Sequence, residues 1–323
     1  MTTGSWARTL GPAELPVTAI GLGLAALGRP GYLNLGHGTD LGTDRSVAAL
    51  ERHAHAVLDA AYDAGVRYFD AARSYGRAEA FLASWLRRRE LAPGEVTVGS
   101  KWGYTYTAGW QVQADPPEVK DLSVDTFRRQ LDETRELLGD HLSLYQIHSA
   151  TVESGVLDDP AVLSALAELR SSGVSVGLTT TGPEQAQTVA RALEAGGFDT
   201  VQATWNLLEP SVGPALADAH RDGLGVIVKE ALANGRLTSR GGCPELDELA
   251  RRLEASPDAV ALAAVLAQPW ADVVLSGAGT GEQIMSNLGA RQVRWDAKAA
   301  EAVAGLAEVP EAYWQRRAQL DWN

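Results

Sequence analysis

Three short apolar segments of this chain each end in a residue suited to acid–base or electrostatic chemistry. Segment 66–70 ends in Asp70, segment 96–101 ends in Lys101, and segment 142–148 ends in His148. A fourth residue, Tyr75, follows the aspartate by five positions. If the three segments are neighbouring parallel strands, their carboxyl ends share one rim and bring the four side chains together. That combination suits the reduction of a carbonyl group.

Tyr75 is the candidate general acid of this set. A free tyrosine has a pKa of about 10 and holds its proton tightly at neutral pH. An ammonium beside the ring stabilises the phenolate, so Lys101 is expected to lower the pKa of Tyr75, with Asp70 keeping the lysine charged. His148 is expected to donate a hydrogen bond to a substrate carbonyl and fix its approach. Taken singly, each residue also fits a structural role, and their shared position at strand ends favours the catalytic interpretation.

A repeated alternation of segments would position these residues. Short β-branched runs alternate with longer stretches of helical apolar spacing, which predicts βα units. The predicted strands are residues 17–23, 66–70, 96–100, 142–147, 174–179, 200–205, 225–230 and 272–277. The predicted helices are residues 46–65, 77–90, 123–139, 160–173, 183–197, 211–223, 245–255, 257–267 and 281–290. This α/β pattern predicts a (β/α)8 TIM barrel forming a single domain over residues 1–323, with an open doubly wound sheet as the alternative.

Local signals mark several boundaries of these elements. Ser123 is a good N-cap for the third helix, which Gly139 is expected to end. Pro210 and Ser211 suggest the start of the sixth helix, and Gly223 its end. Two longer insertions, 28–45 and 102–122, follow predicted strand ends, where barrel enzymes build their pockets.

Aromatic residues in and near the second insertion predict the character of that pocket. Trp102, Tyr104, Trp110 and Trp205 suggest aromatic walls, which suit apolar carbonyls and sugar faces alike.

Composition argues against several classes of partner. The formal net charge of −13 and the pI of about 4.9 would repel nucleic acids and anionic membranes. The longest apolar run, 259–267, is too short to span a bilayer, and the N-terminus lacks an apolar signal core, so a cytoplasmic protein is expected. The lone Cys243 allows no internal disulfide. His53 and His55 point to different helix faces, so no metal site is expected.

Two glycine-rich segments are candidate phosphate-binding turns. GLGLAALG (21–28) follows a predicted strand, but the loop-like GRPGYLNLGHG after it replaces the helix that a dinucleotide fingerprint requires. SGAGTGEQ (276–283) runs from the last predicted strand into a helix, where exposed backbone amides attract phosphate. A tight strand-to-helix turn is the alternative interpretation of this second segment.

With these motifs in place, the sequence resembles the aldo-keto reductase family. The resemblance runs from RTLGPAELPVTAIGLG through FDAARSYG, SKWG, LYQIHSA and VQATWNLLEP to SGAGTGEQIMSN. It implies a (β/α)8 barrel that transfers hydride between a nicotinamide cofactor and a small carbonyl or alcohol substrate, such as an aldehyde, ketone or sugar. The family's catalytic tetrad falls on Asp70, Tyr75, Lys101 and His148, with Tyr75 delivering the proton.

The same resemblance implies the residues that bind the cofactor. Gln202 would bind the nicotinamide carboxamide, and the phosphate and adenine end would be lined by Ser276, Gly277, Thr280, Gln283 and Asn287. Thr179-Thr180 stands where the family usually has a Ser-Asn pair. Lys229 stands where the family has the tyrosine that stacks on the nicotinamide. Gly279 stands where the family often has the basic residue that holds the 2′-phosphate of NADP. NADP is still expected, because the family mostly uses it and Thr280 is retained; NAD is the alternative.

Two other functions compete with catalytic carbonyl reduction. The changes at Thr180 and Lys229 also fit a non-catalytic protein that senses cofactor redox state on the same scaffold. A lyase or isomerase could use Lys101 as a Schiff base, but Asp70 is expected to keep that amine protonated and non-nucleophilic. The reductase interpretation is therefore preferred.

Overall fold

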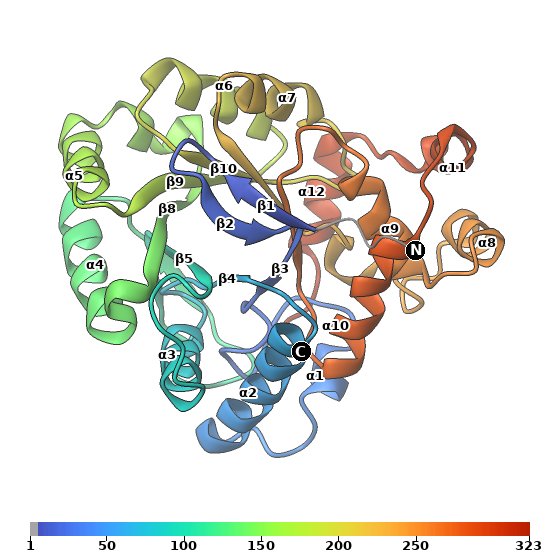
Figure 1. Cartoon of the computed structure of the whole chain (residues 1–323), viewed down its shortest axis with the longest axis horizontal. Coiled ribbons are helices and arrows are strands. Elements are labelled where there is room, and N and C mark those ends of the chain that lie inside the picture. Colours follow the sequence, from blue (N-terminus) through green and yellow to red (C-terminus); the bar gives the residue numbers. More distant parts are fainter. Residues whose placement is uncertain (1–5) are drawn as a thin grey trace.

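The computed structural model describes residues 6–323, and its centre is a closed barrel of parallel strands. Around the barrel the order is β3, β4, β5, β8, β9, β10, β11 and β12, and β12 pairs with β3 to close it. The bounds are Ile20–Gly23, Tyr68–Asp70, Thr97–Trp102, Leu142–Ala150, Ser175–Thr180, Thr200–Thr204, Gly225–Lys229 and Val273–Ser276. Figure 1 looks along the barrel and shows the helices arranged around it. The predicted (β/α)8 barrel is confirmed, and the open sheet is wrong.

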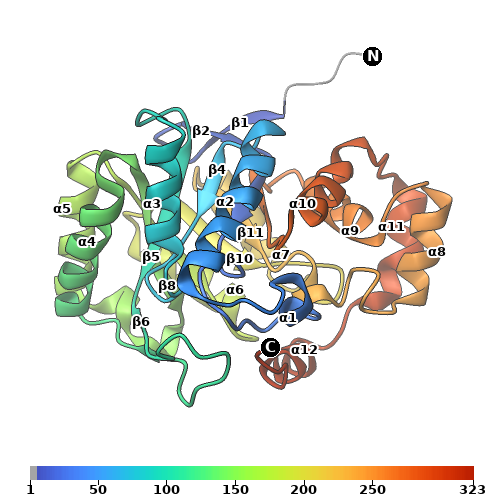
Figure 2. The ribbon, with the colours of Figure 1, turned by 90° about the horizontal axis from the view of Figure 1, so that it is seen from below.

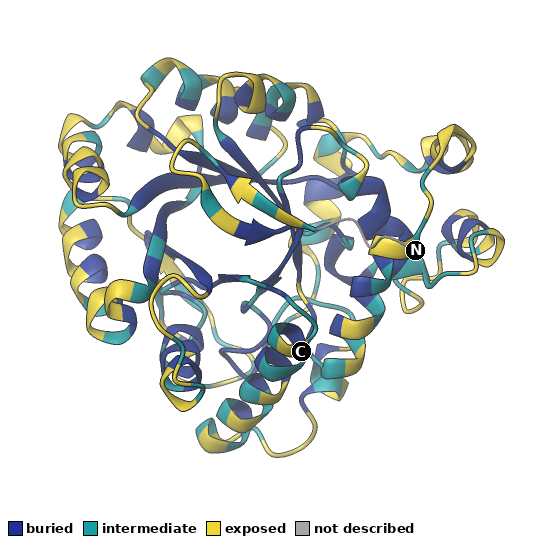
Figure 3. Cartoon of the chain, viewed as in Figure 1, coloured by how far each residue is buried: buried dark blue, intermediate teal, exposed yellow. Residues whose placement is uncertain are grey.

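Every helix that the sequence predicts is present, with its ends shifted by a few residues. They are α2 (Val47–Asp63), α3 (Ala78–Arg88), α4 (Val124–Leu138), α5 (Pro160–Ser171), α6 (Gln185–Ala195), α7 (Gly213–Arg221), α8 (Pro244–Arg252), α9 (Pro257–Leu266) and α10 (Gly281–Leu288). Figure 3 shows the barrel strands and the inward helix faces largely buried and the outer helix faces exposed. The alternation of short apolar runs with amphipathic stretches therefore reports a barrel core covered by helices.

The predicted boundaries are confirmed for one helix, and the predicted start of another is wrong. The Ser123 hydroxyl accepts a hydrogen bond from the Thr126 amide at 3.3 Å, and Gly139 ends α4 at a φ of 52°, as predicted. The predicted start at Pro210 and Ser211 is wrong, because α7 begins at Gly213. The Ser211 hydroxyl is instead hydrogen-bonded to the Glu209 carboxylate.

Several short elements lie outside the predicted ones. They are α1 (His37–Asp40), β6 (Tyr104–Tyr106), β7 (Glu118–Lys120), α11 (Ala297–Val303) and α12 (Pro310–Ala318). Short 3-10 helices span Gly139–His141, Val152–Ser154, Val156–Asp158, Ala233–Gly235, Gly289–Gln292 and Ala304–Leu306. The two insertions thus contribute α1 and an antiparallel β6–β7 hairpin.

The two ends of the barrel are covered differently. An antiparallel hairpin of β1 (Ala7–Leu10) and β2 (Leu15–Thr18) closes the end where the strands begin, and its Leu10 packs with Tyr68 and Leu144. The predicted strand 17–23 is therefore divided between β2 and β3. Figure 2 shows α1, β6 and α12 gathered at the opposite end. The carboxyl ends of the strands open toward these segments.

The last residue of the chain is tied to the first insertion. The Asn323 side chain accepts a hydrogen bond from the Gly38 amide at 2.8 Å and donates one to the Asn34 carbonyl at 2.9 Å. The segment after α12 therefore forms part of this end of the barrel.

No helix within residues 6–323 is both long enough and apolar enough to cross a bilayer.

Candidate active site

Asp70 and Lys101 form a buried ion pair at the carboxyl ends of the adjacent strands β4 and β5. The lysine side chain is 1% exposed and the aspartate 2%, and the lysine Nζ contacts Asp70 Oδ2. Lys101 Nζ also donates to the Ala71 carbonyl at 2.9 Å. The second oxygen, Asp70 Oδ1, accepts the Tyr68 hydroxyl at 3.1 Å. These donors fix the carboxylate, and the carboxylate fixes the ammonium.

Tyr75 and His148 complete the predicted group of four. Lys101 Nζ lies 5.0 Å from the centre of the Tyr75 ring. The rings of Tyr75 and His148 meet edge to face, with centroids 5.5 Å apart and planes at 83°. The structure thus brings all four predicted catalytic residues together at one end of the barrel.

The protonation of Tyr75 differs from the sequence-based expectation. Burial raises the pKa of Tyr75, the negative charge of Asp70 adds to this effect, and Arg29 opposes it. The difference comes mainly from burial, which outweighs the nearby positive charges. The Tyr75 phenol therefore keeps its proton at neutral pH.

His148 is neutral at physiological pH. Burial lowers its pKa well below the ordinary value, and the positive charges of Lys101 and Lys229 lower it further. A neutral imidazole carries one N–H group and can donate one hydrogen bond. Nδ1 lies 3.5 Å from the Ser74 hydroxyl, which leaves Nε2 for a ligand. The ring is held between Tyr75 and Tyr104, whose centroid is 5.0 Å away.

The glycine-rich segment 21–28 positions Tyr75 and is not followed by the helix of a dinucleotide fingerprint. After β3 the chain continues through turns and loops to α1, as the sequence predicted. A Cβ on Gly28 would lie 2.1 Å from the Tyr75 carbonyl oxygen, and the Gly28 carbonyl accepts the Arg77 amide at 2.7 Å. Gly76, at a φ of 62°, packs against the same carbonyl. The close approach of two backbones explains Gly28.

A cavity of about 410 Å³ extends from the tetrad along the barrel rim. Asp70, Tyr75 and His148 line it, whereas Lys101 is not among its lining residues and is almost fully buried. Six of the residues predicted to bind the cofactor also line the cavity: Gln202, Lys229, Ser276, Gly277, Gln283 and Asn287. These residues extend from the middle of the barrel to the turn before α10.

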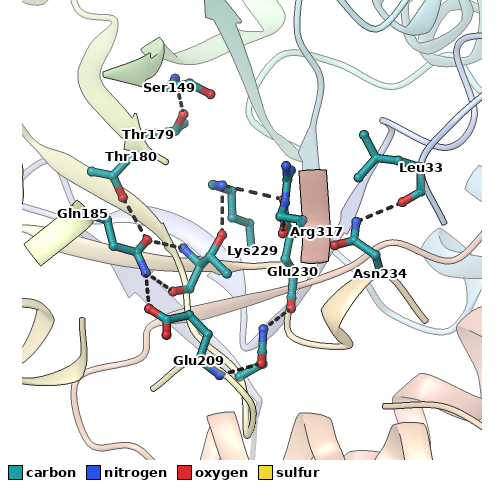
Figure 4. A network of polar contacts seen from close by, with 12 residues as sticks. Leu33, Ser149, Thr179, Thr180, Gln185, Glu209, Lys229, Glu230, Asn234 and Arg317 are labelled. Carbon is teal, nitrogen blue, oxygen red and sulfur yellow. Dashed lines mark hydrogen bonds and ion pairs between the residues drawn. The ribbon is translucent and has the colours of Figure 1, made fainter. Parts of the chain in front are cut away.

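Three residues predicted to bind the cofactor do not line this cavity. Thr179 accepts the Ser149 amide at 2.7 Å, and Thr180 donates to Gln185 Oε1 at 3.3 Å (Figure 4). Both threonines are fully buried, and their neighbour Thr181 lines the cavity instead. Thr280 caps α10 by accepting the Gln283 amide at 3.1 Å. Their hydroxyls therefore stabilise the segments that form the cavity wall without lining the cavity themselves.

Lys229 belongs to a charged group that includes α12. Its Nζ donates to Thr204 at 3.0 Å and lies 3.9 Å from Glu230, and Arg317 donates to both Glu230 oxygens at 2.5 and 2.7 Å (Figure 4). Burial lowers the pKa of Lys229 to about 8, even though Glu230 opposes this. Burial raises the pKa of Glu230, but Arg317 and Lys229 outweigh it and lower the value to about 2. No motif in the sequence indicated that Arg317 would reach this site.

The lining of the cavity suits a dinucleotide chemically at both ends. A Cβ on Gly277 would meet no atom within 4 Å, so the backbone of this turn faces open space. The turn leads into the N-terminus of α10, where backbone amides favour phosphate. The other end holds a proton donor and a neutral imidazole, which suit hydride transfer. Within residues 6–323, no cluster of three or more His, Cys, Asp and Glu side chains could hold a metal ion.

The aromatic wall differs from the one that the sequence predicted. Trp102 packs against Phe127, Trp205 against Trp270 and Trp110 against Phe81, and none of the three tryptophans lines the cavity.

Tyr32 and Trp322 line the cavity instead, and both rings pack against Arg29. The Arg29 guanidinium carbon lies 5.2 Å from the Tyr32 ring centre and 4.4 Å from that of Trp322. These residues come from the first insertion and the chain end. Sequence spacing could not connect them.

Comparisons with known proteins identify a family profile, sequence relatives and similar structures. A family profile described as Aldo/keto reductase family matches residues 20–308. The chain is 28% identical over 274 residues to a pyridoxal 4-dehydrogenase of Microbacterium luteolum, covering 74% of this chain and 75% of that protein. It is 24% identical to an NADH-specific methylglyoxal reductase of Escherichia coli, covering 94% and 98%. The fold matches an aldo-keto reductase structure from Bacillus halodurans with a TM-score of 0.72 and 22% identity, covering 94% and 96%.

Proposed function

The chain belongs to the aldo/keto reductase family, a family of NAD(P)-dependent oxidoreductases, and from this premise we propose that Tyr75 is its general acid–base. In this proposal the protein interconverts a small carbonyl compound and its alcohol. The observation that carries the proposal is the cluster of Tyr75, His148 and the buried Lys101–Asp70 pair at one end of the cavity.

The four residues divide the work of proton transfer. When bound, the nicotinamide supplies a hydride to the carbonyl carbon or takes one from the alcohol. Tyr75 gives its phenolic proton to the carbonyl oxygen as negative charge develops there, so that hydride and proton together yield the alcohol. Lys101 stabilises the resulting phenolate, and Asp70 holds the ammonium in place. The His148 N–H group fixes the carbonyl oxygen.

The cofactor would extend along the cavity wall. Gln202 would hold the nicotinamide carboxamide, and the stem of Lys229 would cover the ring. The phosphates and adenine would lie against Ser276, Gly277, Gln283 and Asn287. Thr179, Thr180 and Thr280 would act through the backbone that they hold. NADP remains the prediction from the resemblance, and these residues could hold either nicotinamide dinucleotide in the same way.

Small aldehydes and alcohols are the first substrates to test. The relatives are named for pyridoxal and methylglyoxal, and the buried cationic group of Arg29 and the two rings beside it offer polar and aromatic contacts. Turnover is followed at the absorbance of the reduced nicotinamide.

Replacing Tyr75 by phenylalanine tests the assigned role. The Tyr75→Phe variant is expected to bind NADH or NADPH as the wild type does and to lose at least about 100-fold in turnover, because it lacks the proton donor. Tyr62→Phe is the matched control, since Tyr62 packs against Trp85 on the outer layer. Full activity of Tyr75→Phe would refute the proposal. Tight cofactor binding without turnover on any carbonyl, alcohol or sugar would instead favour the redox sensor.

A further inference from the structure

The far end of the cavity carries a single basic side chain among the residues described. Four lysine and arginine side chains line the cavity: Arg29, Lys229, Arg240 and Arg317. Arg29 lies beside Tyr75, and Lys229 and Arg317 flank Glu230. Only Arg240 lies near Gln283, on the side of the turn before α10. Among the lysines and arginines that line the cavity, Arg240 is therefore the one placed to meet the adenosine part of a dinucleotide.

Arg240 is already engaged by Asp40 of α1. Its Nη1 and Nη2 donate to the two Asp40 oxygens at 2.8 and 2.5 Å, and Nη1 also donates to the Leu35 carbonyl at 2.9 Å. The pair is bidentate, which is the strongest arrangement of these two groups. The aspartate side chain is only 6% exposed and the arginine 37%. Binding a phosphate through Arg240 would require this pair to break.

The Asp40 carboxylate is held at a defined place beside the turn. Gln283 Nε2 donates to Asp40 at 2.9 Å, and Gln283 Oε1 accepts the Gly279 amide at 2.8 Å. A Cβ on Gly279 would lie 3.8 Å from an Asp40 oxygen. Burial opposes ionisation of Asp40, but the hydrogen bonds from Arg240 and Gln283 outweigh it and lower its pKa. The negative charge of Asp40 thus lies next to the point where the side chain of a basic residue at position 279 would leave the backbone.

The balance of charge at this end is negative. Asp258 and Glu282 also line the cavity, next to Gln283 and Ser286. Because Asp40 cancels Arg240, these two carboxylates are left uncompensated. The 2′-phosphate of NADP brings about two further negative charges at neutral pH, whereas NAD has a neutral hydroxyl there. Like charges brought together in this way oppose binding.

We propose that the Asp40–Arg240 pair makes the protein selective for NAD over NADP, because Asp40 occupies the one guanidinium that could bind the 2′-phosphate. This inference rests on the proposed function, in which the cavity holds a nicotinamide dinucleotide. It revises the sequence-based prediction of NADP. The sequence showed that Gly279 lacks a positive charge, but not that an aspartate from residues 28–45 lies beside it.

Direct binding of the two reduced dinucleotides, without substrate, tests the inference. Dissociation constants for NADH and NADPH are measured by energy transfer from tryptophan to the reduced nicotinamide. The wild type is expected to bind NADH at least about tenfold more tightly than NADPH. Asp40→Asn frees Arg240 while keeping the side-chain shape, so NADPH is expected to bind about tenfold more tightly and NADH to change by less than about twofold.

Three further variants isolate the cause. In the double variant Asp40→Asn/Arg240→Gln, the gain in NADPH binding is expected to disappear, because the freed guanidinium is gone. Asp44→Asn makes the same charge change at an exposed position of the same insertion and is expected to leave both constants unchanged. Gly279→Arg adds a cation without altering α1 and is expected to improve NADPH binding. It remains informative if Asp40→Asn does not fold.

The outcomes separate this inference from the proposed function. Tighter binding of NADPH than NADH by the wild type would overturn the inference alone. An equal change of both constants in Asp40→Asn, together with no gain in Gly279→Arg, would also overturn it. Binding of neither dinucleotide to the folded wild type would overturn the proposed function and the inference with it.

Discussion

The residues at the barrel mouth keep their charges in buried pairs. Lys101 is neutralised by Asp70, and Arg317 by Glu230. A charge left alone in the interior costs several kcal/mol, so removing one partner is more harmful than removing both. Comparing a variant that lacks one partner with a variant that lacks both therefore separates the structural role of the Lys101–Asp70 pair from its catalytic role.

Replacing Lys101 by methionine is expected to lower both stability and turnover. The variant leaves the buried Asp70 carboxylate unpaired, at a cost of about 3–5 kcal/mol in the free energy of unfolding. The double variant Asp70→Asn/Lys101→Met is expected to recover most of that stability while its turnover stays low, because the phenolate of Tyr75 still lacks its ammonium. Urea unfolding and nicotinamide absorbance measure the two effects. A single variant as stable as the wild type would contradict the expectation.

Lys229 makes stability depend on alkaline pH. Its pKa is about 8 in the folded protein and 10.5 ordinarily, so the folded protein releases this proton first as pH rises. The unfolded chain then binds more protons than the folded one, and stability rises between these two values. From pH 7 to 9.5 the wild type is expected to gain about 2 kcal/mol relative to Lys229→Met. Urea unfolding of both proteins at the two pH values checks this; a constant difference would rule it out.

The identities of the catalytic residues were predictable, but their environment was not. Asp70, Lys101 and His148 stand at ends of strands that their apolar neighbours reveal, so their convergence follows from the barrel. The pKa of Tyr75 is raised by burial and by Asp70, and is opposed by Arg29, which lies far from Tyr75 in sequence. Side-chain partners from distant segments are what sequence spacing cannot supply.

Among the elements, the position of the loop after β4, which carries Tyr75, depends on its contact with the loop after β3, which carries Gly28. Gly28→Ala would place a methyl group against the Tyr75 carbonyl and must shift one backbone. A displacement of about 1 Å at a catalytic group can cost about 100-fold in rate, so turnover is expected to fall by at least that factor. Gly305→Ala is the control, because a Cβ there meets no atom within 4 Å. Steady-state kinetics of the two variants measure this effect. Equal activity of Gly28→Ala and Gly305→Ala would show that the contact does not position the catalytic group.

Elements with a clear apolar pattern were predictable, and elements without one were not. The barrel strands and α2–α10 carry periodic apolar patterns that a buried face requires. In contrast, α1 has four residues and is held by contacts such as that between Gly38 and Asn323. The helix α12 is anchored through Arg317 and Glu230. Such elements owe their conformation to tertiary contacts more than to their own sequence.

For the molecule as a whole, one end of the barrel is closed by packing and the other end carries the cavity. Leu10 is fully buried at the end closed by the β1–β2 hairpin, opposite the cavity. Leu10→Ala is expected to lower the free energy of unfolding by about 2–5 kcal/mol and to leave kcat and cofactor binding unchanged. Gly28→Ala is expected to lower kcat instead, because its clash lies at the catalytic end. A loss of kcat in folded Leu10→Ala would contradict this expectation.

The contacts of Trp322 and Asn323 have a practical consequence for anyone handling this protein. Because Trp322 stacks on Arg29 and Asn323 bonds to Gly38 and Asn34, a purification tag appended after residue 323 begins beside the mouth through which ligands enter. A tag placed ahead of Trp6 begins at the other end, next to β1 (Figure 2). Tethering to a surface, or fusion to a reporter protein, should therefore use the amino-terminal side.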